Sequence, residues 1–331
     1  LDGMRHHEEA IASYRRAIAL RPHFAEAHNS LAQMLWNLNR HEAAIASYQK
    51  ALALRPDYAE AHTSLIHACQ YLCAWSQLAR EPEALRERVT QDKCGRIQPF
   101  SFLALPTHEL REQYLCARQF AEEQYRELMS PPPLCGTELR ADPPKLRIGY
   151  LSADFHEHAT SYLLAEIIER LDRRSFEVIG YSHGPDDASP MRRRMRAAFD
   201  TFRDVAPLSH EDTARQILDD QIDVLIDLKG YTEYNRLPIL ALRPAPVQVS
   251  WLGYPGTLGH PRLADYIIGD AIVTPLEHAA HYSETLALMP NCFQLLRDGA
   301  AVPLAVIDEE MCRHFEASCH PTRYYESWCD A

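Results

Sequence analysis

The strongest constraint on the fold is an internal repeat, because residues 8–22 recur 34 residues later as residues 42–56. The first copy reads EEAIASYRRAIALRP and the second reads EAAIASYQKALALRP. Alanines and a tyrosine recur on one helical face in each copy. Each copy ends in proline, which lacks an amide donor and stops a helix. The pattern predicts stacked helical hairpins, in which each repeat buries its apolar face against its neighbours.

The period and the marker positions resemble the tetratricopeptide repeat. The match continues past the prolines, since FAEAH ending at His28 is matched by YAEAH ending at His62. Both histidines occupy the same repeat position, which favours packing over ligand binding. We therefore expect residues 1–73 to be tetratricopeptide repeats, incomplete at the N-terminus because the first hairpin lacks its leading helix.

Beyond the repeats, residues 74–143 keep helical spacing and many charges but lose the repeat signature. Proline clusters at residues 130–133 and 142–144 punctuate the end of this stretch. Such clusters favour stiff, extended segments, so the sequence predicts a helical connector over residues 74–143.

From residue 144 to residue 294, apolar runs alternate with amphipathic segments. We predict strands at residues 146–152, 176–182, 223–228, 247–251 and 265–268, and helices at residues 160–171, 189–199 and 209–221. Alternation of this kind implies a mostly parallel sheet covered on both faces, a Rossmann-like domain. The first strand is not followed by Gly-x-Gly-x-x-Gly, and no P-loop signature occurs, so a nicotinamide, flavin or P-loop site has no support.

Ligands of such sheets bind where strands end and helices begin. Three segments follow predicted strands and carry polar residues or glycines: SADFHEHATS at residues 152–161, DLKGYT at residues 227–232 and WLGYPGT at residues 251–257. The sequence therefore predicts a ligand site at this edge of the sheet.

Those segments, with FEVIGYSHGPDD, LRPAPVQVSWLGYPGTLG and DYIIGD between and after them, resemble the O-linked N-acetylglucosamine (O-GlcNAc) transferases. The similarity follows the order of the N-terminal catalytic half of that family and spans residues 146–294 closely. In the family, tetratricopeptide repeats precede a catalytic region of the GT-B type. The resemblance implies a protein O-GlcNAc transferase-like activity, which moves N-acetylglucosamine from UDP-GlcNAc to Ser or Thr of proteins.

The resemblance also implies site residues. His158 stands at the family's histidine after the first strand, as an acid/base or donor-contacting group; an imidazole exchanges protons near neutral pH. The alternative is a loop histidine that only caps the following helix. The loop that resembles the segment approaching sugar and acceptor consists of Gly253, Tyr254, Pro255, Gly256 and Thr257. Its glycines permit close backbone approach, although a plain structural turn stays equally open.

Four further residues lie at matching positions: Asp227, Lys229, Tyr231 and Thr232. We expect Asp227 either to act as a catalytic carboxylate or to be a strand-end carboxylate paired with Lys229. The other three are candidate sugar- or substrate-binding residues.

The repeats imply protein or peptide substrates, but Ser30 and Ser64 stand where family arrays often carry asparagines that grip substrate backbones. No cofactor and no metal are expected, since helix N-termini and basic side chains can neutralise a pyrophosphate. The formal charge of −12 argues against a nucleic-acid partner, and the chain lacks an apolar run long enough to cross a membrane. Nine scattered cysteines fit a reducing compartment, so we expect a cytoplasmic protein.

Relatives of this kind continue into a second Rossmann-like domain that holds most nucleotide-sugar contacts. Residues 295–331 do not resemble the family, and we expect an unrelated tail, frameshifted or disordered. Two interpretations of function therefore stay open. The chain is either an incomplete O-GlcNAc transferase-like enzyme or a non-catalytic repeat module that binds protein partners.

Overall fold

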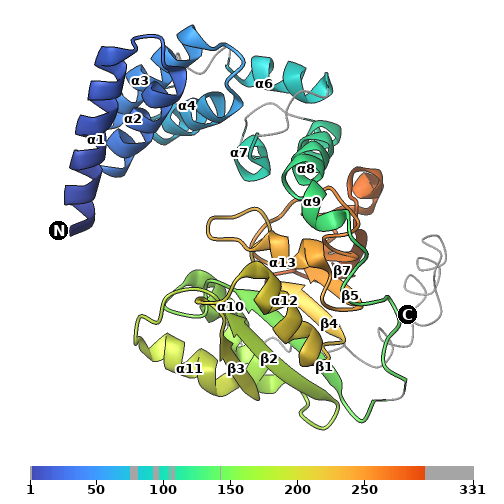
Figure 1. Cartoon of the computed structure of the whole chain (residues 1–331). Helices are drawn as coiled ribbons and strands as arrows, with labels where there is room; N and C mark the ends of the chain where they lie inside the picture. Colours follow the sequence, from blue (N-terminus) through green and yellow to red (C-terminus); the bar gives the residue numbers. More distant parts are fainter. Residues whose placement is uncertain are drawn as a thin grey trace. The chain divides into compact units, whose positions relative to one another are not determined.

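The computed structural model describes residues 2–74, 81–91, 97–103, 105, 109–141 and 143–294 (Figure 1). They form two compact units, which divide between Gln124 and Tyr125. The first unit is a helical array and the second is built on a parallel sheet, which confirms the predicted fold class. Residues 295–331, for which an unrelated tail was predicted, lie outside the described residues.

Seven described helices make up the first unit: α1 (Asp2–Leu20), α2 (Ala25–Asn37), α3 (His41–Leu54), α4 (Ala59–Tyr71), α6 (Glu81–Thr90), α7 (Pro99–Leu103) and α8 (Leu110–Gln124). Helix α1 packs on α2, α2 on α3 and α3 on α4, as stacked hairpins require. Ala44, Tyr48 and Ala51 of the repeat pattern are buried in the shared core. Their small or flat side chains let neighbouring helices approach closely.

The two repeat histidines have a structural role, as the sequence predicts. His62 Nε2 lies 2.9 Å from the carbonyl oxygen of Pro56, and His28 Nε2 lies 3.4 Å from that of Pro22. Both imidazoles are buried. Each one ties a helix to the proline that ended the previous helix, so the same contact is repeated along the array.

The second unit contains seven parallel strands: β1 (Leu146–Ser152), β2 (Phe176–Ser182), β3 (Thr201–Asp204), β4 (Val224–Asp227), β5 (Val247–Ser250), β6 (Tyr266–Asp270) and β7 (Thr285–Met289). Their order in the sheet is β3-β2-β1-β4-β5-β6-β7. Five of the seven were predicted from apolar runs. The two that were missed, β3 and β7, are the edge strands, and their side chains are mostly only partly buried.

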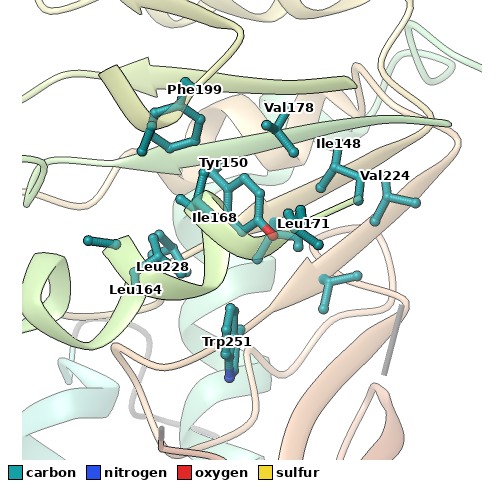
Figure 2. Close-up of a cluster of buried hydrophobic side chains, with 14 of the residues drawn as sticks. Ile148, Tyr150, Leu164, Ile168, Leu171, Val178, Phe199, Val224, Leu228 and Trp251 are labelled. Atoms are coloured by element: carbon teal, nitrogen blue, oxygen red, sulfur yellow. The ribbon is translucent and has the colours of Figure 1, made fainter. Parts of the chain in front are cut away.

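Helices cover both faces of this sheet: α9 (Arg126–Met129), α10 (Ala159–Arg170), α11 (Pro190–Ala198), α12 (His210–Asp219), α13 (Leu237–Leu242) and the 3-10 helix η1 (Leu276–His281). On one face, Tyr150 and Val178 pack with Leu164 and Ile168 of α10 (Figure 2). On the other face, the Tyr181 hydroxyl donates to Asp220 after α12, and Gln248 Nε2 donates to a carbonyl of α13. Successive side chains of a strand point to opposite faces, and both faces of this sheet pack against helices, as the sequence predicts.

Serine caps begin two of these helices. Ser189 Oγ accepts from the amide of Arg192, and Ser209 Oγ accepts from the amide of Asp212, each at 3.0 Å. The helix predicted at residues 209–221 therefore begins at a Ser209 cap, and such caps satisfy amides that a helix leaves without partners. None of the described helices is both long and apolar enough to cross a membrane.

Residues 125–141, which are part of the predicted connector, pack within the second unit. The amides of Leu134 and Cys135 donate to the carbonyls of Leu242 and Arg243. Arg140 forms an ion pair with the buried carboxylate of Asp223. These contacts fasten the proline-rich stretch to the sheet.

Candidate functional site

The three loops singled out by sequence meet at the carboxyl edge of the sheet. In the parallel register Leu151 pairs with Asp227, and Asp227 pairs with Ser250. Strands β1, β4 and β5 therefore end side by side, and residues 153–158, 228–232 and 251–257 leave them in the same direction.

Glycines allow these loops to lie directly against one another. A Cβ on Gly253 would come within 2.0 Å of the carbonyl oxygen of Leu228. Gly230 has a φ of +51°, and a Cβ there would lie 2.4 Å from Cβ of Tyr254. In the neighbouring loop after β2, a Cβ on Gly184 would lie 1.7 Å from the carbonyl oxygen of Ala153. These close approaches are to protein atoms, so the glycines define how the loops pack.

Replacing Gly253 with alanine is expected to destabilise the second unit by about 1–3 kcal/mol, because the new methyl group displaces a backbone carbonyl. Gly136→Ala is the matched control, since nothing lies within 4 Å of a Cβ built there. Urea unfolding of both variants measures the difference. Equal unfolding midpoints for the two variants would contradict the packing described above.

An ion pair between Lys229 and Asp154 joins the first two loops. Lys229 Nζ donates to Asp154 Oδ1 at 3.0 Å and to Oδ2 at 2.9 Å, and both side chains are less than a tenth exposed. The predicted pairing of Lys229 with Asp227 is therefore wrong. The strand end points Asp227 to one face of the sheet, while the lysine, two residues later, turns toward the loop after β1.

Asp227 is fully buried and largely unpartnered. Its Oδ2 accepts from the amide of Gly230 at 2.6 Å, whereas Oδ1 has no hydrogen-bond partner among the described residues. Burial raises the pKa of the Asp227 carboxyl to about 7, even though the amides of Gly230 and Lys229 act to lower it. With no exposed surface, this carboxylate contacts no substrate in the present conformation. The geometry favours a structural role for it.

His158 is the candidate that solvent reaches. It is the N-cap residue of α10, and its Nδ1 accepts from the amide of Thr160 at 3.2 Å. The same nitrogen lies 3.7 Å from Asp154 Oδ2, and the side chain is 42% exposed. The helix-capping alternative is thus realised, but capping uses one ring nitrogen and leaves Nε2 for a ligand.

Side chains of the loop after β5 mostly hold the loop itself. The Thr257 hydroxyl donates to Glu284 Oε2 at 2.7 Å, and the amide of Leu258 donates to Glu284 Oε1 at 2.6 Å. Burial raises the pKa of Glu284 against the effect of these hydrogen bonds. Gly256 is also buried, and Pro255 is the exposed residue of the loop. A ligand approaching residues 253–257 would therefore meet the proline and backbone first.

The remaining candidates are tied to the same loops. The Tyr231 hydroxyl donates to the carbonyl of Leu258 at 2.7 Å, and its ring packs edge-on against Tyr254. Thr232 Oγ1 donates to the carbonyl of Lys229 at 2.8 Å, and this threonine is half-buried. The structure brings all predicted site residues to one edge of the sheet. The accessible ones are His158, Thr232, Gly253 and Pro255.

Sequence reasoning missed three residues of this edge: Asp154, His183 and Glu284. Asp154 lies inside the first motif and could have been weighed as a partner for the lysine. His183 directly follows β2, and its Nε2 lies 3.1 Å from the carbonyl of Tyr234. Glu284 is distant in sequence from residues 257 and 258, to which it is hydrogen-bonded, so no local sequence pattern predicts this contact.

No group of three or more His, Cys, Asp or Glu side chains able to hold a metal occurs among the described residues. The expectation of a metal-independent site stays a prediction.

Comparison with known families adds to this geometry. A family model described as glycosyl transferase family 41 matches residues 85–303, and a tetratricopeptide repeat model matches residues 1–59. The first match covers all three loops and most of the chain. This chain belongs to glycosyl transferase family 41. The family match begins within the predicted connector and extends past Gln294, where we predicted that the resemblance stops.

Curated relatives support the same family. The chain is 36% identical over 243 residues to a probable UDP-N-acetylglucosamine–peptide N-acetylglucosaminyltransferase (SEC) of Arabidopsis thaliana, covering 69% of this chain and 24% of that protein. It is 34% identical over 234 residues to the UDP-N-acetylglucosamine–peptide N-acetylglucosaminyltransferase of Caenorhabditis elegans, covering 68% and 20%. The chain thus spans a quarter or less of the length of these two family 41 proteins.

A solved structure shares the fold. A mutant of the Thermobaculum terrenum O-GlcNAc transferase superposes with a TM-score of 0.63 at 28% sequence identity. The similarity covers 88% of this chain and 57% of that one. The helical array followed by a parallel sheet is therefore the arrangement of a family 41 transferase, the N-terminal half of its GT-B fold.

Proposed function

We propose that this chain carries the first Rossmann-like domain of a transferase that moves N-acetylglucosamine from UDP-GlcNAc to Ser or Thr hydroxyls of proteins. The observation that carries the proposal is the family 41 match over residues 85–303, which includes every loop at the carboxyl edge. The names of the relatives, UDP-N-acetylglucosamine–peptide N-acetylglucosaminyltransferases, supply the donor and the peptide acceptor. The edge offers an exposed imidazole beside closely packed, glycine-containing loops.

The proposed role of His158 follows from its hydrogen bond. Because Nδ1 accepts from the amide of Thr160, the neutral ring carries its proton on Nε2. That N–H can donate to an oxygen of the bound substrate, a sugar hydroxyl or a phosphate. We therefore favour substrate contact over proton abstraction for the neutral ring, and the Asp154–Lys229 pair keeps the loop in place beneath it.

The same proposal includes binding of protein substrates by the repeats. The repeats form a helical array of stacked hairpins, which is the part of the chain that we propose to contact protein substrates. A metal-free reaction and a cytoplasmic location belong to the proposal too, and five described cysteines, all free thiols, agree with a reducing compartment.

Transfer of labelled sugar tests this function. The chain, and the longest product of its gene, are incubated with UDP-GlcNAc labelled in the sugar and with a protein extract. We expect label on Ser and Thr, released by base-catalysed β-elimination as an O-linked sugar. Absence of transfer under conditions in which the Thermobaculum terrenum enzyme is active would refute the enzymatic proposal. Binding of proteins by residues 1–73 without any transfer would then favour the interaction module.

A further inference from the structure

A pocket of about 340 Å³ opens at the same end of the sheet, beyond β2. His183, which follows β2, and His210, which begins α12, both line it. Arg236, the residue before α13, lines it as well. Polar groups from three separate elements therefore face one space that none of the predicted site residues lines.

Arg236 is a buried cation whose partners are all neutral. It is 9% exposed. Its Nε donates to His210 Nδ1 at 3.1 Å, and its two terminal nitrogens donate to the carbonyls of Val205 and Leu208 at 2.9 Å. A guanidinium has five N–H donors, so two remain after these bonds. Within the described part of the chain no carboxylate forms an ion pair with it, and an unneutralised buried charge is costly.

The imidazoles of His183 and His210 carry no negative charge that could neutralise the Arg236 guanidinium. Burial lowers the pKa of His183 to about 4, and the charges of Arg236 and Lys229 contribute. Burial and Arg236 also lower the pKa of His210. Both rings are therefore neutral near pH 7. Since His210 accepts at Nδ1, its proton sits on Nε2, which adds a further donor.

Glu211 is the acidic side chain at this pocket. It is exposed, and its charge acts on Arg236 and His210 only at longer range, without an ion pair among the described residues. Solvent and salt screen such an exposed carboxylate. A ligand carrying negative charge could meet the guanidinium far more directly.

We propose that this pocket binds an oxyanion, a phosphate or carboxylate group, with Arg236 as its charge partner and His210 Nε2 as a second donor. The start of α12 lies in the same wall, and the positive end of a helix favours an anion there. Charge-assisted bonds to a planar guanidinium are the strong ones for such groups. The proposal does not depend on the proposed transferase activity and is tested by binding alone.

The test is a phosphate titration of the full chain labelled with ¹³C-histidine, followed by NMR at constant ionic strength. We expect saturable shifts of the His210 and His183 ring signals, identified by losing each signal in His210→Gln and His183→Gln. A parallel titration with a short phosphoserine peptide distinguishes a phosphorylated polypeptide from free phosphate as the source of the oxyanion. Tighter binding of the peptide indicates a polypeptide, whereas equal or tighter binding of free phosphate indicates the ion. Both results support the site. Unchanged histidine signals at millimolar phosphate would overturn it.

Variants distinguish binding of phosphate in this pocket from nonspecific attraction to positive charge elsewhere on the chain. Arg236→Gln should weaken phosphate binding by about tenfold or more, and Glu211→Gln should tighten it by about two- to fivefold. Because Arg236 also holds two carbonyls, Ala206→Glu provides a variant at an exposed pocket position. Its carboxylate should occupy the pocket and abolish the shifts, whereas Ala197→Glu on the exposed face of α11 should keep them. Undiminished phosphate binding in Ala206→Glu would place the anion elsewhere and refute the site.

Discussion

Asp227→Asn is expected to remove a large pH dependence from the stability of the sheet unit. Burial raises the pKa of this carboxyl from 3.8 to about 7, so the folded state keeps a proton that the unfolded chain releases. The resulting stabilisation is fully present below about pH 4 and is lost as pH rises through about 7. Its size is on the order of 4 kcal/mol. Asparagine does not titrate and still offers an oxygen to the amide of Gly230.

The measurement is hydrogen exchange of the β4 amides, corrected for the intrinsic rate at each pH. The free energy of unfolding of Asp227→Asn, minus that of the wild type, should rise between pH 4 and 7. Asp270→Asn is the control, because a carboxyl whose pKa lies below the ordinary 3.8 titrates mostly below pH 4, so its difference should stay nearly flat between pH 4 and 7. Burial acts to raise the pKa of Asp270, but hydrogen bonds from three backbone amides lower it overall. A flat difference for Asp227→Asn would mean that this carboxylate finds a partner or water that stabilises its charge.

Lys229→Met should cost about 3–5 kcal/mol of stability, because it leaves the carboxylate of Asp154 buried without its partner. Both members of the pair are less than a tenth exposed, and the two hydrogen bonds are short. Arg194→Met is the matched control, since the Arg194–Glu169 pair is equally short but well exposed. Such exposed pairs contribute about 0–1 kcal/mol.

The double variant Asp154→Asn with Lys229→Met shows how much of the stability lost in Lys229→Met comes from the unpaired carboxylate of Asp154. Removing both charges should restore much of the stability lost in Lys229→Met alone, because no unpaired carboxylate stays behind. Urea unfolding at pH 7 gives all three free energies. Equal losses for Lys229→Met and Arg194→Met would contradict a buried ion pair at this edge.

Much of this fold follows from local sequence. The 34-residue repeat predicts stacked hairpins, and apolar runs predict the interior strands β1, β2, β4, β5 and β6. The edge strand β3 is missed because its sequence, TFRD, has a single apolar residue. The edge strand β7, TLALM, is apolar, but periodicity alone does not distinguish so short an apolar run from a helix segment. The start of the helix predicted at residues 209–221 is also local, because the cap joins Ser209 to Asp212, three positions later.

The candidate site is less predictable because its contacts join distant residues. The sequence places His158, Lys229 and the loop at residues 253–257 at strand ends, which the sheet then brings together. The partner of Lys229 is 75 residues away in the chain, so the nearer Asp227 was the natural but mistaken choice. The burial of Asp227, at the end of β4, depends on the loops that pack over this edge of the sheet, and a strand pattern alone does not place those loops.

The rate of N-acetylglucosamine transfer from UDP-GlcNAc to protein, measured for His158 variants in the active form of the protein, tests directly whether this histidine contacts the substrate. His158→Asn retains a helix-capping side chain but loses the imidazole. His156→Ala changes the neighbouring histidine, whose ring lies 5.7 Å away. We predict that His158→Asn loses about 100-fold or more in rate, at unchanged thermal stability, while His156→Ala stays near the wild-type rate. Wild-type transfer by His158→Asn, or an equal loss in both variants, would contradict a substrate-contacting histidine at this edge.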